Sequence, residues 1–290
     1  MYVRVIPRLD IKGPNLVKGV HMEGLRVLGK PEHFARHYYE NGADELYYMD
    51  AVASLYERNS LVDIIERTTR EIFIPLTVGG GLRSVEDIRT VLRAGADKVS
   101  INTAAIREPA FITRAARAFG SSTVVVAIDA VQHPDGSYEA VTEYGREPTG
   151  IDPFEWAERA VDLGAGELLV TSINREGTGR GFDVGLVRRI AESVPVPVIA
   201  GGGAGTIAHI SEAVREGKAD AVSMSSILHY NVIRHRHYSD EEFEEEGNVE
   251  FLQGRRGDLE WSRIQDTTLP EIKAGLAAEN IPCRPVTAIA

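Results

Sequence analysis

The sequence predicts an α/β protein of the (β/α)8 TIM-barrel class, built from two (βα)4 half-barrels in one domain spanning residues 1–290. Eight short runs rich in β-branched residues alternate with amphipathic segments, as in parallel βαβ units. Several short motifs of the first half recur in the same order in the second half. A barrel of this class takes ~250 residues. The competing arrangement, an open doubly wound sheet, usually needs fewer strands.

The expected elements follow one another at regular intervals along the chain. In the segment 85–94, Val85, Ile88, Val91 and Leu92 share one face of a helix. Similar spacing predicts helices over residues 110–119, 153–163 and 184–194. The expected strands are residues 3–11, 45–52, 74–79, 98–102, 123–130, 167–173, 196–200 and 221–225.

Internal repetition supports the closed barrel. Residues 42–46 (GADEL) recur as residues 164–168 (GAGEL), and the three glycines at 79–81 recur at 201–203 with the same separation. The motif ADKVS at residues 96–100 likewise recurs as ADAVS at a similar separation. Duplication of a (βα)4 unit explains such ordered matches.

Composition excludes several classes of protein. Hydrophobic residues make up 43% of the chain, as in globular proteins, and no apolar run is long enough to cross a membrane. A single cysteine, Cys283, excludes an internal disulfide framework. The net charge of −11 predicts no attraction to nucleic acid or anionic membranes. The first residues lack the layout of a signal peptide, so we expect a cytoplasmic protein.

An acidic insertion, residues 231–265, interrupts the pattern before a final helix. Six of the seven residues at 240–246 are acidic. Such a run is usually a solvated surface, and a partner-binding arm is the alternative. Helical spacing then resumes, with a face expected to cover the last strand of the barrel and formed by Leu269, Ile272, Leu276 and Ala277.

Two carboxylates are expected at the carboxyl ends of opposite strands, where barrel enzymes carry their chemistry. Asp10 ends the first expected strand and Asp129 ends the fifth. The pair can serve as general acid and general base if their environments separate their pKa values. The simpler alternative is that each aspartate caps the turn that follows it.

The duplicated glycine clusters predict two phosphate sites. Glycines at residues 79–81 and 201–203 each follow a strand and precede a helix, where backbone N–H groups bind anions. Asn102 and Thr103 supply donors in the first half, as Ser225 and Ser226 do in the second. Two such sites flanking two carboxylates suggest a substrate phosphorylated at both ends, although tight turns alone also explain such glycines.

Other residues near the expected strand ends are less specific. Lys18, in an expected loop with Gly13 and Gly19, reaches either a phosphate or a carboxylate, or is a solvated surface lysine. Asp50 ends the second strand and either supports the chemistry or orients Lys18. The glycine-rich residues 174–181 form either an anion-binding loop or a linker.

No metal or cofactor site is expected. The histidines at 209, 229, 235 and 237 lack the spacing of a zinc site. Cys283 is a poor candidate for a nucleophile, so a thiol-dependent glutaminase activity is not expected in this chain.

The motifs together resemble the cyclase subunit of imidazole glycerol phosphate synthase. The resemblance covers roughly residues 1–230 and 266–285. It is carried by Arg4, Leu9-Asp10, LVKG at 16–19, VGGG at 78–81, ADKVSINTA at 96–104, VAIDA at 126–130, TSI at 171–173, GGAG at 202–205 and SILH at 226–229.

The resemblance implies an ammonia-dependent reaction of histidine biosynthesis on a bisphosphate substrate. It implies that Asp10 and Asp129 are the acid/base pair. It also implies a separate glutaminase subunit, docked at the amino-terminal face of the barrel. Its phosphate sites correspond to Gly81, Asn102 and Thr103 and to Gly177, Gly203 and Ser226; its ring of charged residues around an ammonia entrance corresponds to Arg4, Glu45, Lys98 and Glu167.

The sequence also departs from the family pattern. Arg8 replaces a common cysteine, and the loop usually written Asp-Arg-Asp-Gly-Thr begins Asn174-Arg175-Glu176 here. These features and the acidic insertion leave two alternatives open. One is a paralogue that delivers ammonia for amidination of a sugar in surface-polysaccharide synthesis, and the other is a noncatalytic scaffold for a glutaminase.

Overall fold

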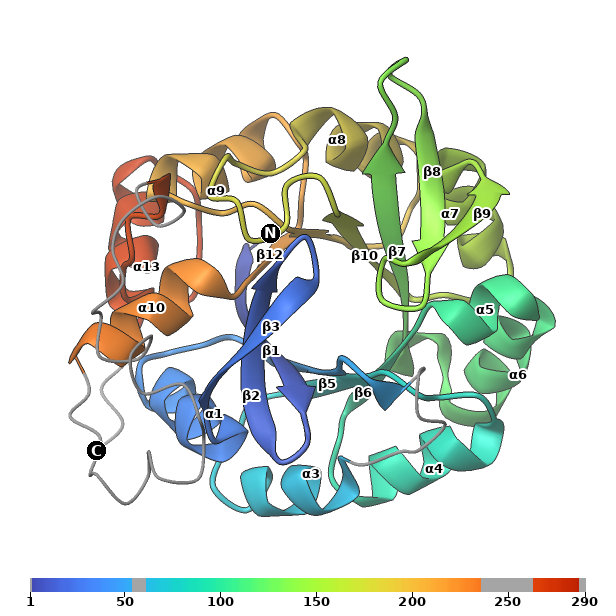
Figure 1. Ribbon diagram of the computed structural model, residues 1–290, viewed down its shortest axis with the longest axis horizontal. Coiled ribbons are helices and arrows are strands. Elements are labelled where there is room, and N and C mark those ends of the chain that lie inside the picture. Colours follow the sequence, from blue (N-terminus) through green and yellow to red (C-terminus); the bar gives the residue numbers. More distant parts are fainter. Residues whose placement is uncertain (1, 54–60, 236–262, 287–290) are drawn as a thin grey trace.

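The computed structural model describes residues 2–53, 61–235 and 263–286. Eight parallel strands close into a barrel, which confirms the predicted fold, and helices surround the ring (Figure 1). Each strand begins and ends within two residues of its expected bounds. In order around the barrel the strands are β1 (Arg4–Lys12), β4 (Leu46–Asp50), β5 (Leu76–Gly79), β6 (Lys98–Ile101), β7 (Val124–Gln132), β10 (Glu167–Ser172), β11 (Val198–Gly201) and β12 (Ala221–Met224).

The helices expected from apolar spacing are present, and polar caps define their starts. The Ser84 hydroxyl accepts a hydrogen bond from Asp87 N, and the Asp87 side chain accepts one in return, so α4 begins with a capping box. Thr206 caps α9 in the corresponding place of the second half. The helices are α1 (Pro31–Glu40), α3 (Val62–Thr68), α4 (Val85–Arg93), α5 (Thr103–Arg107), α6 (Ala110–Phe119), α7 (Pro153–Asp162), α8 (Val184–Ser193), α9 (Ile207–Arg215), α10 (Ser226–His235) and α13 (Leu269–Ala278), with a short 3-10 helix at Ser121–Thr123.

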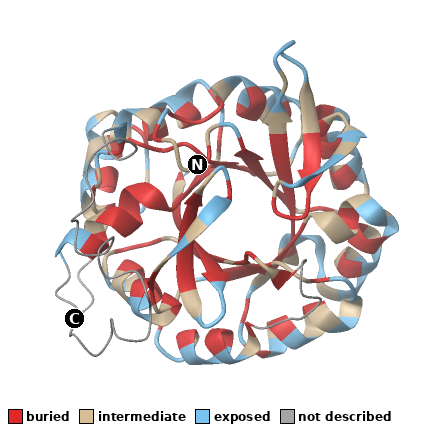
Figure 2. Cartoon of the chain, in the orientation of Figure 1, coloured by how far each residue is buried: buried red, intermediate tan, exposed pale blue. Residues whose placement is uncertain are grey.

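The core has two layers because successive strand residues point to opposite faces of the sheet. The ring strands are almost entirely buried (Figure 2). One set of their side chains forms the barrel interior, and the alternate set belongs to the larger apolar cluster shared with the helices. On β1, the residues of one face are Arg4, Ile6, Arg8 and Asp10, which therefore extend from one end of the barrel to the other. The interior apolar layer consists of Ile6, Tyr47, Val125, Ala127, Leu169, Ile199 and Ala221.

Two antiparallel hairpins, which the sequence did not predict, extend the first strand of each half. β2 (Asn15–Val20) pairs with β1 and with β3 (Glu23–Gly29), so residues 13–30 are not the loop that was expected. β8 (Tyr138–Thr142) pairs with β7 and with β9 (Glu147–Ile151). Apolar side chains from both hairpins meet in one buried cluster, whose members include Val17, Met22, Val141 and Tyr144. The hairpins therefore cover part of the carboxyl-terminal end of the barrel.

The last helix packs differently from the prediction in one respect. Leu269, Ile272 and Leu276 are buried as expected, but Ala277 is exposed and Lys273 is buried in its place. Lys273 Nζ lies 2.7 Å from Asp44 Oδ1, so an ion pair compensates the burial of its charge. α13 contacts α9.

The segment after α13 returns to the amino-terminal end of β1. Cys283 forms an isolated parallel bridge with Val3, the residue before β1. Arg284 Nε donates to Asp44 Oδ1 at 2.8 Å, which fixes the segment to the residue before Glu45.

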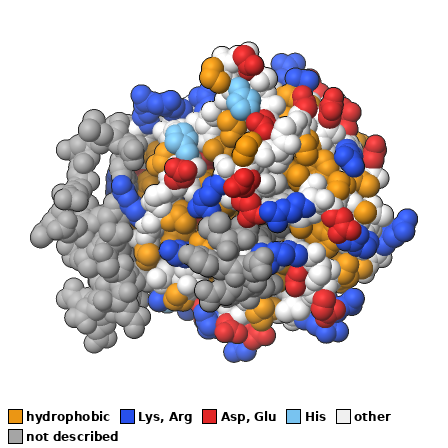
Figure 3. Space-filling model, turned by 45° about the vertical axis from the view of Figure 1, so that its right-hand side comes forward, with side chains coloured by type: hydrophobic (Ala, Val, Ile, Leu, Met, Phe, Trp, Pro, Cys, Tyr) orange, Lys and Arg blue, Asp and Glu red, His pale blue; other side chains and the backbone are white. Residues whose placement is uncertain are grey.

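The predicted acidic insertion lies largely beyond the described residues. Residues 231–235 form the end of α10, whereas residues 236–262 lie outside the described part of the chain. Within the described ranges, no helix is long and apolar enough to cross a membrane. Basic and acidic side chains are interspersed over the face shown in Figure 3.

Candidate active site

Asp10 and Asp129 are both buried at the carboxyl-terminal end of the barrel, on β1 and β7. Asp10 Oδ1 accepts a hydrogen bond from Arg8 Nε at 2.9 Å, and Lys18 Nζ lies 3.8 Å from Asp10 Oδ2. Asp129 Oδ2 accepts a hydrogen bond from Asn102 Nδ2 at 2.9 Å. Both side chains bond to other side chains of the barrel mouth, which disfavours the simple turn-capping alternative.

The two environments separate the pKa values of the pair. Burial favours the neutral form of Asp10, but the positive charges of Arg8 and Lys18 outweigh it and lower the pKa of this carboxyl. Burial raises the pKa of Asp129, and Arg8 together with the Asn102 amide offsets this only in part. Asp10 therefore favours the carboxylate, and Asp129 favours the protonated form more than an ordinary aspartate.

Lys18 is a buried member of this cluster, and the alternative of a solvated surface lysine is wrong. It lies on β2 and forms an ion pair with Glu176 in the loop after β10. The hairpin is held to that loop by His21, whose backbone N donates to Glu176 O at 2.9 Å and whose Nδ1 lies 2.7 Å from Ile173 O. Burial lowers the pKa of Lys18, but the neighbouring carboxylates outweigh it and raise the value.

Asp50 does not orient Lys18, whose carboxylate partners in the described structure are Glu176 and Asp10. Asp50 Oδ1 accepts a hydrogen bond from Val52 N at 3.1 Å and therefore closes the turn after β4. It nevertheless lies beside Gly80 at the edge of the first glycine cluster. Asp50 is thus placed to contact a bound molecule without contacting Lys18.

Arg8 and Tyr144 are site residues that the sequence analysis did not assign. Arg8 is 5% exposed, and its guanidinium lies over the ring of Tyr47, 5.6 Å from the centroid. The period of two along β1 places Arg8 on the same face as Asp10 and was the available signal. Tyr144 lies in the β8–β9 turn with a φ of 58°, and its burial raises its pKa well above the ordinary value. Contacts with the other hairpin bury this ring, so the local sequence carried no comparable signal.

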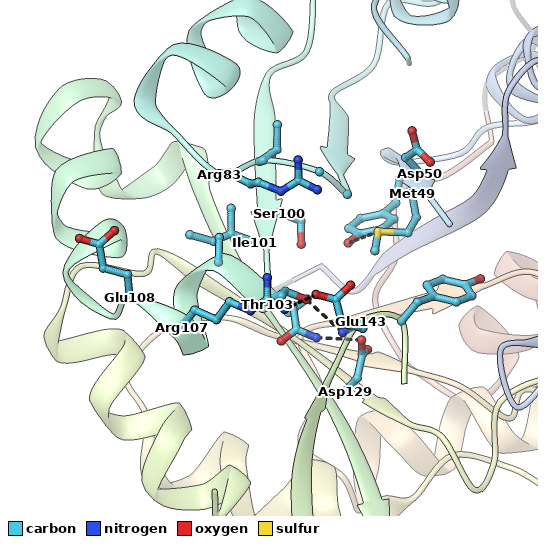
Figure 4. Close-up of a pocket in the computed structure, with 18 residues that line it drawn as sticks. Met49, Asp50, Arg83, Ser100, Ile101, Thr103, Arg107, Glu108, Asp129 and Glu143 are labelled. Atoms are coloured by element: carbon cyan, nitrogen blue, oxygen red, sulfur yellow. Dashed lines mark hydrogen bonds and ion pairs between the residues drawn. The ribbon is translucent and has the colours of Figure 1, made fainter. Parts of the chain in front are cut away.

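The first glycine cluster borders a cavity of about 220 Å³, hereafter the first cradle (Figure 4). Gly80 has a φ of 95°, and a Cβ on it would lie 2.5 Å from Asp50 O, so only glycine fits this turn. Figure 4 shows Arg107 and Glu143 at its edge, where Arg107 Nη2 donates to Glu143 Oε1 at 2.8 Å. The cavity is lined by residues that include Gly81, Arg83, Asn102, Thr103 and Asp129.

The second glycine cluster borders a much smaller space, hereafter the second cradle, with a volume of about 10 Å³. A Cβ on Gly203 would lie 2.2 Å from Gly181 O, so the backbone of the two segments is in close contact. The predicted phosphate-site residues Gly177, Gly203 and Ser226 all line it, as do Arg8 and Glu176. The structure thus brings together both predicted sets of phosphate ligands, one at each side of the mouth.

The opposite end of the barrel carries a ring of four charged side chains. Arg4 Nη1 lies 2.7 Å from Glu45 Oε1, and Arg4 also pairs with Glu167. Lys98 Nζ lies 3.2 Å from Glu45 Oε2 and 3.0 Å from Glu167 Oε2, so charges of opposite sign alternate around the ring. All four residues that the sequence analysis grouped as an ammonia entrance are in contact.

No metal-binding constellation is found among the described residues. No group of three or more histidine, cysteine, aspartate or glutamate side chains in the described ranges is arranged to hold an ion. The ionisable cluster at the mouth pairs carboxylates with Arg8 and Lys18 instead.

The closed barrel, with its ionisable cluster at the carboxyl ends of the strands, defines the class of (β/α)8-barrel enzymes. A family model described as histidine biosynthesis protein matches residues 4–234. The imidazole glycerol phosphate synthase subunit HisF of Legionella pneumophila is 56% identical over 205 residues, which are 71% of this chain and 97% of that protein. The subunit of the same name from Alkaliphilus metalliredigens (strain QYMF) is 47% identical over 230 residues, 79% of this chain and 91% of that protein. The chain belongs to the histidine biosynthesis protein family, in its group of imidazole glycerol phosphate synthase HisF subunits.

Proposed function

We propose that this chain is the cyclase subunit of an imidazole glycerol phosphate synthase. The observation that carries the proposal is the burial of Asp10 and Asp129 at the barrel mouth in different surroundings, Asp10 beside Arg8 and Asp129 beside Asn102. In the proposed reaction, ammonia adds to the bisphosphate N′-(phosphoribulosyl)formimino-aminoimidazole carboxamide ribonucleotide. Loss of water, cyclisation and cleavage then release imidazole glycerol phosphate and aminoimidazole carboxamide ribonucleotide.

The pKa order supports a division of labour between the two aspartates. Asp10, with its lowered pKa, accepts a proton during addition and ring closure. Asp129, with its raised pKa, holds a proton and donates it to the leaving nitrogen. Lys18 and Arg8 keep Asp10 ionised, and Asn102 orients Asp129.

The two cradles are proposed to bind the two phosphates of the substrate. Backbone N–H groups at glycine turns approach an anion closely, and hydroxyl and amide donors add to them. Asp50 and Lys18 complete the proposed contacts between the cradles. The assigned residues are Gly81, Asn102 and Thr103 in the first cradle and Gly177, Gly203 and Ser226 in the second.

A glutaminase subunit is proposed to dock at the amino-terminal face and to supply the ammonia, forming a heterodimer. The ring of Arg4, Glu45, Lys98 and Glu167 lies at that end, and its ion pairs must open for ammonia to pass. Burial raises the pKa of the Cys283 thiol, which supports the view that this chain supplies no thiolate nucleophile of its own.

The sugar-amidating paralogue is not favoured. The two similar proteins described above are both named synthase subunits, and this chain aligns with 97% and 91% of their lengths. A noncatalytic scaffold would not require a buried, charge-compensated aspartate pair at the mouth.

Incubation of the purified chain with the bisphosphate and an ammonium salt tests the proposal. We expect wild-type protein to consume the substrate and Asp129→Asn to lower turnover by about 10²–10⁴-fold, the usual contribution of a general acid. Asp10→Asn is expected to be comparably impaired. Asp162→Asn, at the end of α7 outside the site, is the control and should leave turnover unchanged.

Wild-type protein that is inert toward the bisphosphate but binds a glutaminase tightly would support the scaffold instead. Activity that appears only with a uridine-diphosphate sugar would support the paralogue.

A further inference from the structure

The two cradles differ in how much room they offer an anion. The first cradle has a volume of about 220 Å³, whereas the second, at about 10 Å³, accommodates roughly one water molecule. The second cradle nevertheless has an unused donor. The hydroxyl of Ser223 is buried, lines the cradle and has no hydrogen-bond partner within the described structure. Such an unpartnered group indicates a site that a polar ligand completes.

Glu176 is the acidic side chain that lines the second cradle. One of its oxygens, Oε1, is paired with Lys18 Nζ. The other, Oε2, lies over the glycine turn, where a Cβ added to Gly202 would be 3.3 Å away from it. Gly202 and Gly203 have φ angles of 85° and 106°, a backbone conformation that favours glycine. An internal carboxylate therefore lies beside the glycine turn that borders the second cradle.

Arg8 borders the same space, and Lys18 is joined to it through Glu176. Lys18 is bound by Glu176, while Arg8 uses Nε for Asp10. Within the described residues, the two terminal nitrogens of Arg8 make no hydrogen bond, and Arg8 lines the cradle. A phosphate has the charge and the oxygen geometry to bind both cations, since a guanidinium fork binds phosphate through two donors.

We propose that Glu176 is an internal competitor for the second phosphate and sets the affinity of the second cradle. A phosphate enters only when the Glu176 carboxylate withdraws, and it then takes Lys18 and the free end of Arg8 as partners. The identification of this phosphate as part of the bisphosphate rests on the proposed function. The competition between Glu176 and an anion does not rest on the proposed function, because inorganic phosphate is also an anion that needs hydrogen-bond donors.

Phosphate titration of ¹⁵N-labelled full-length protein tests the proposal, because backbone amide shifts report each cradle separately. The amides of Gly81 and Thr103 report the first cradle, and those of Gly203 and Ser226 report the second. In wild-type protein we expect the second cradle to bind inorganic phosphate at least about ten-fold more weakly than the first. Two like charges in a partly buried site repel each other by more than the ~1.4 kcal/mol that corresponds to this factor.

Glu176→Gln removes the charge and keeps the size of the side chain. We expect it to tighten phosphate binding at the second cradle by at least about ten-fold and to leave the first cradle within two-fold of wild type. Glu176→Asp retracts the carboxylate by one methylene and should give an intermediate affinity. Glu192→Gln, an exposed glutamate paired with Arg188, makes the same change in net charge and should alter neither cradle.

Unchanged or weaker phosphate binding at the second cradle of both Glu176 variants would overturn the proposal, as would equal filling of both cradles in wild-type protein. An unaltered first-cradle titration shows that a variant is folded, and Glu176→Asp keeps the test available if Glu176→Gln does not fold. Turnover of the bisphosphate is measured separately. If the protein does not turn over the bisphosphate, the phosphate titration still tests the competition by Glu176. If the Glu176 variants do not change phosphate binding, the proposed reaction is not affected.

Discussion

Replacing Arg8 by methionine removes the cation closest to Asp10 while keeping most of the side-chain volume. Arg8 is 5% exposed, and its Nε lies 2.9 Å from Asp10 Oδ1. Removing one partner of a buried ion pair costs about 3–5 kcal/mol, because the other charge is left uncompensated. Lys18 Nζ remains 3.8 Å from Asp10, which moves the expectation to the lower end of this range. We therefore expect Arg8→Met to lower the free energy of unfolding by about 3 kcal/mol at pH 7.

The pH dependence of this loss follows from the lowered pKa of Asp10. Because the carboxyl pKa is lower in the folded state, ionised Asp10 stabilises the folded protein at pH values above 3.8, the ordinary pKa of the unfolded chain. This stabilisation disappears as the pH falls through the pKa of the folded state. The stability gap between wild type and Arg8→Met should hence be the same at pH 7 and pH 5. It should narrow at pH 3.

Equilibrium urea unfolding, followed by the fluorescence of buried Trp156, measures the gap at the three pH values. Arg188→Met is the matched control, because Arg188 is an exposed arginine paired with Glu192 and such pairs contribute less than about 1 kcal/mol. A gap below about 0.5 kcal/mol at pH 7, within the range of ordinary surface substitutions, would refute the reasoning. So would a gap that does not change between pH 5 and pH 3.

Two further predictions concern other buried ionisable groups. Burial, with a smaller contribution from Lys18, lowers the pKa of His229 to about 3, so below pH 6.5 the unfolded chain binds a proton that the folded protein does not. His229 should thus lower the free energy of unfolding by about 1.4 kcal/mol for each pH unit between pH 6.5 and 4. Urea unfolding at pH 6.5 and pH 5 measures this pH dependence, and His229→Phe should remove the contribution of this residue. A variant with the same pH dependence as wild type would contradict the prediction. Lys273→Met leaves Asp44 with Arg284 as its remaining cation and should cost about 2–3 kcal/mol in the same measurement, whereas ammonium-driven turnover per folded molecule should be unchanged. If Lys273→Met were as stable as the wild-type protein, the buried ion pair would contribute nothing to the free energy of unfolding.

The ring strands and the aspartate pair were predictable because their signals are local. A parallel strand that is buried on both faces reads as a short apolar run, and its carboxyl end marks the position of the site. Asp10 and Asp129 followed directly from this rule. The alternation of side chains on β1 also carried a signal for Arg8, two residues before Asp10.

The hairpins were missed because their strands are short and because glycine interrupts β2, β3 and β9. Residues 15–29 show no sustained alternation of apolar and polar side chains, and their pairing with β1 is a tertiary event. Likewise, helical spacing favoured Ala277 over Lys273 for the buried face of α13. An ion pair with Asp44, more than two hundred residues earlier in the chain, decided otherwise.

By itself the amino-acid sequence determined the duplicated barrel, the location of the two aspartates and the two glycine turns, since each depends on the pattern of neighbouring residues. Only the tertiary structure decided the environments of these groups. Whether Lys18 meets solvent or a carboxylate, and whether Glu176 or a ligand fills the second cradle, depends on segments that converge from distant parts of the chain. Because burial and nearby charge set pKa values and anion affinity, the chemistry of the mouth follows from that convergence.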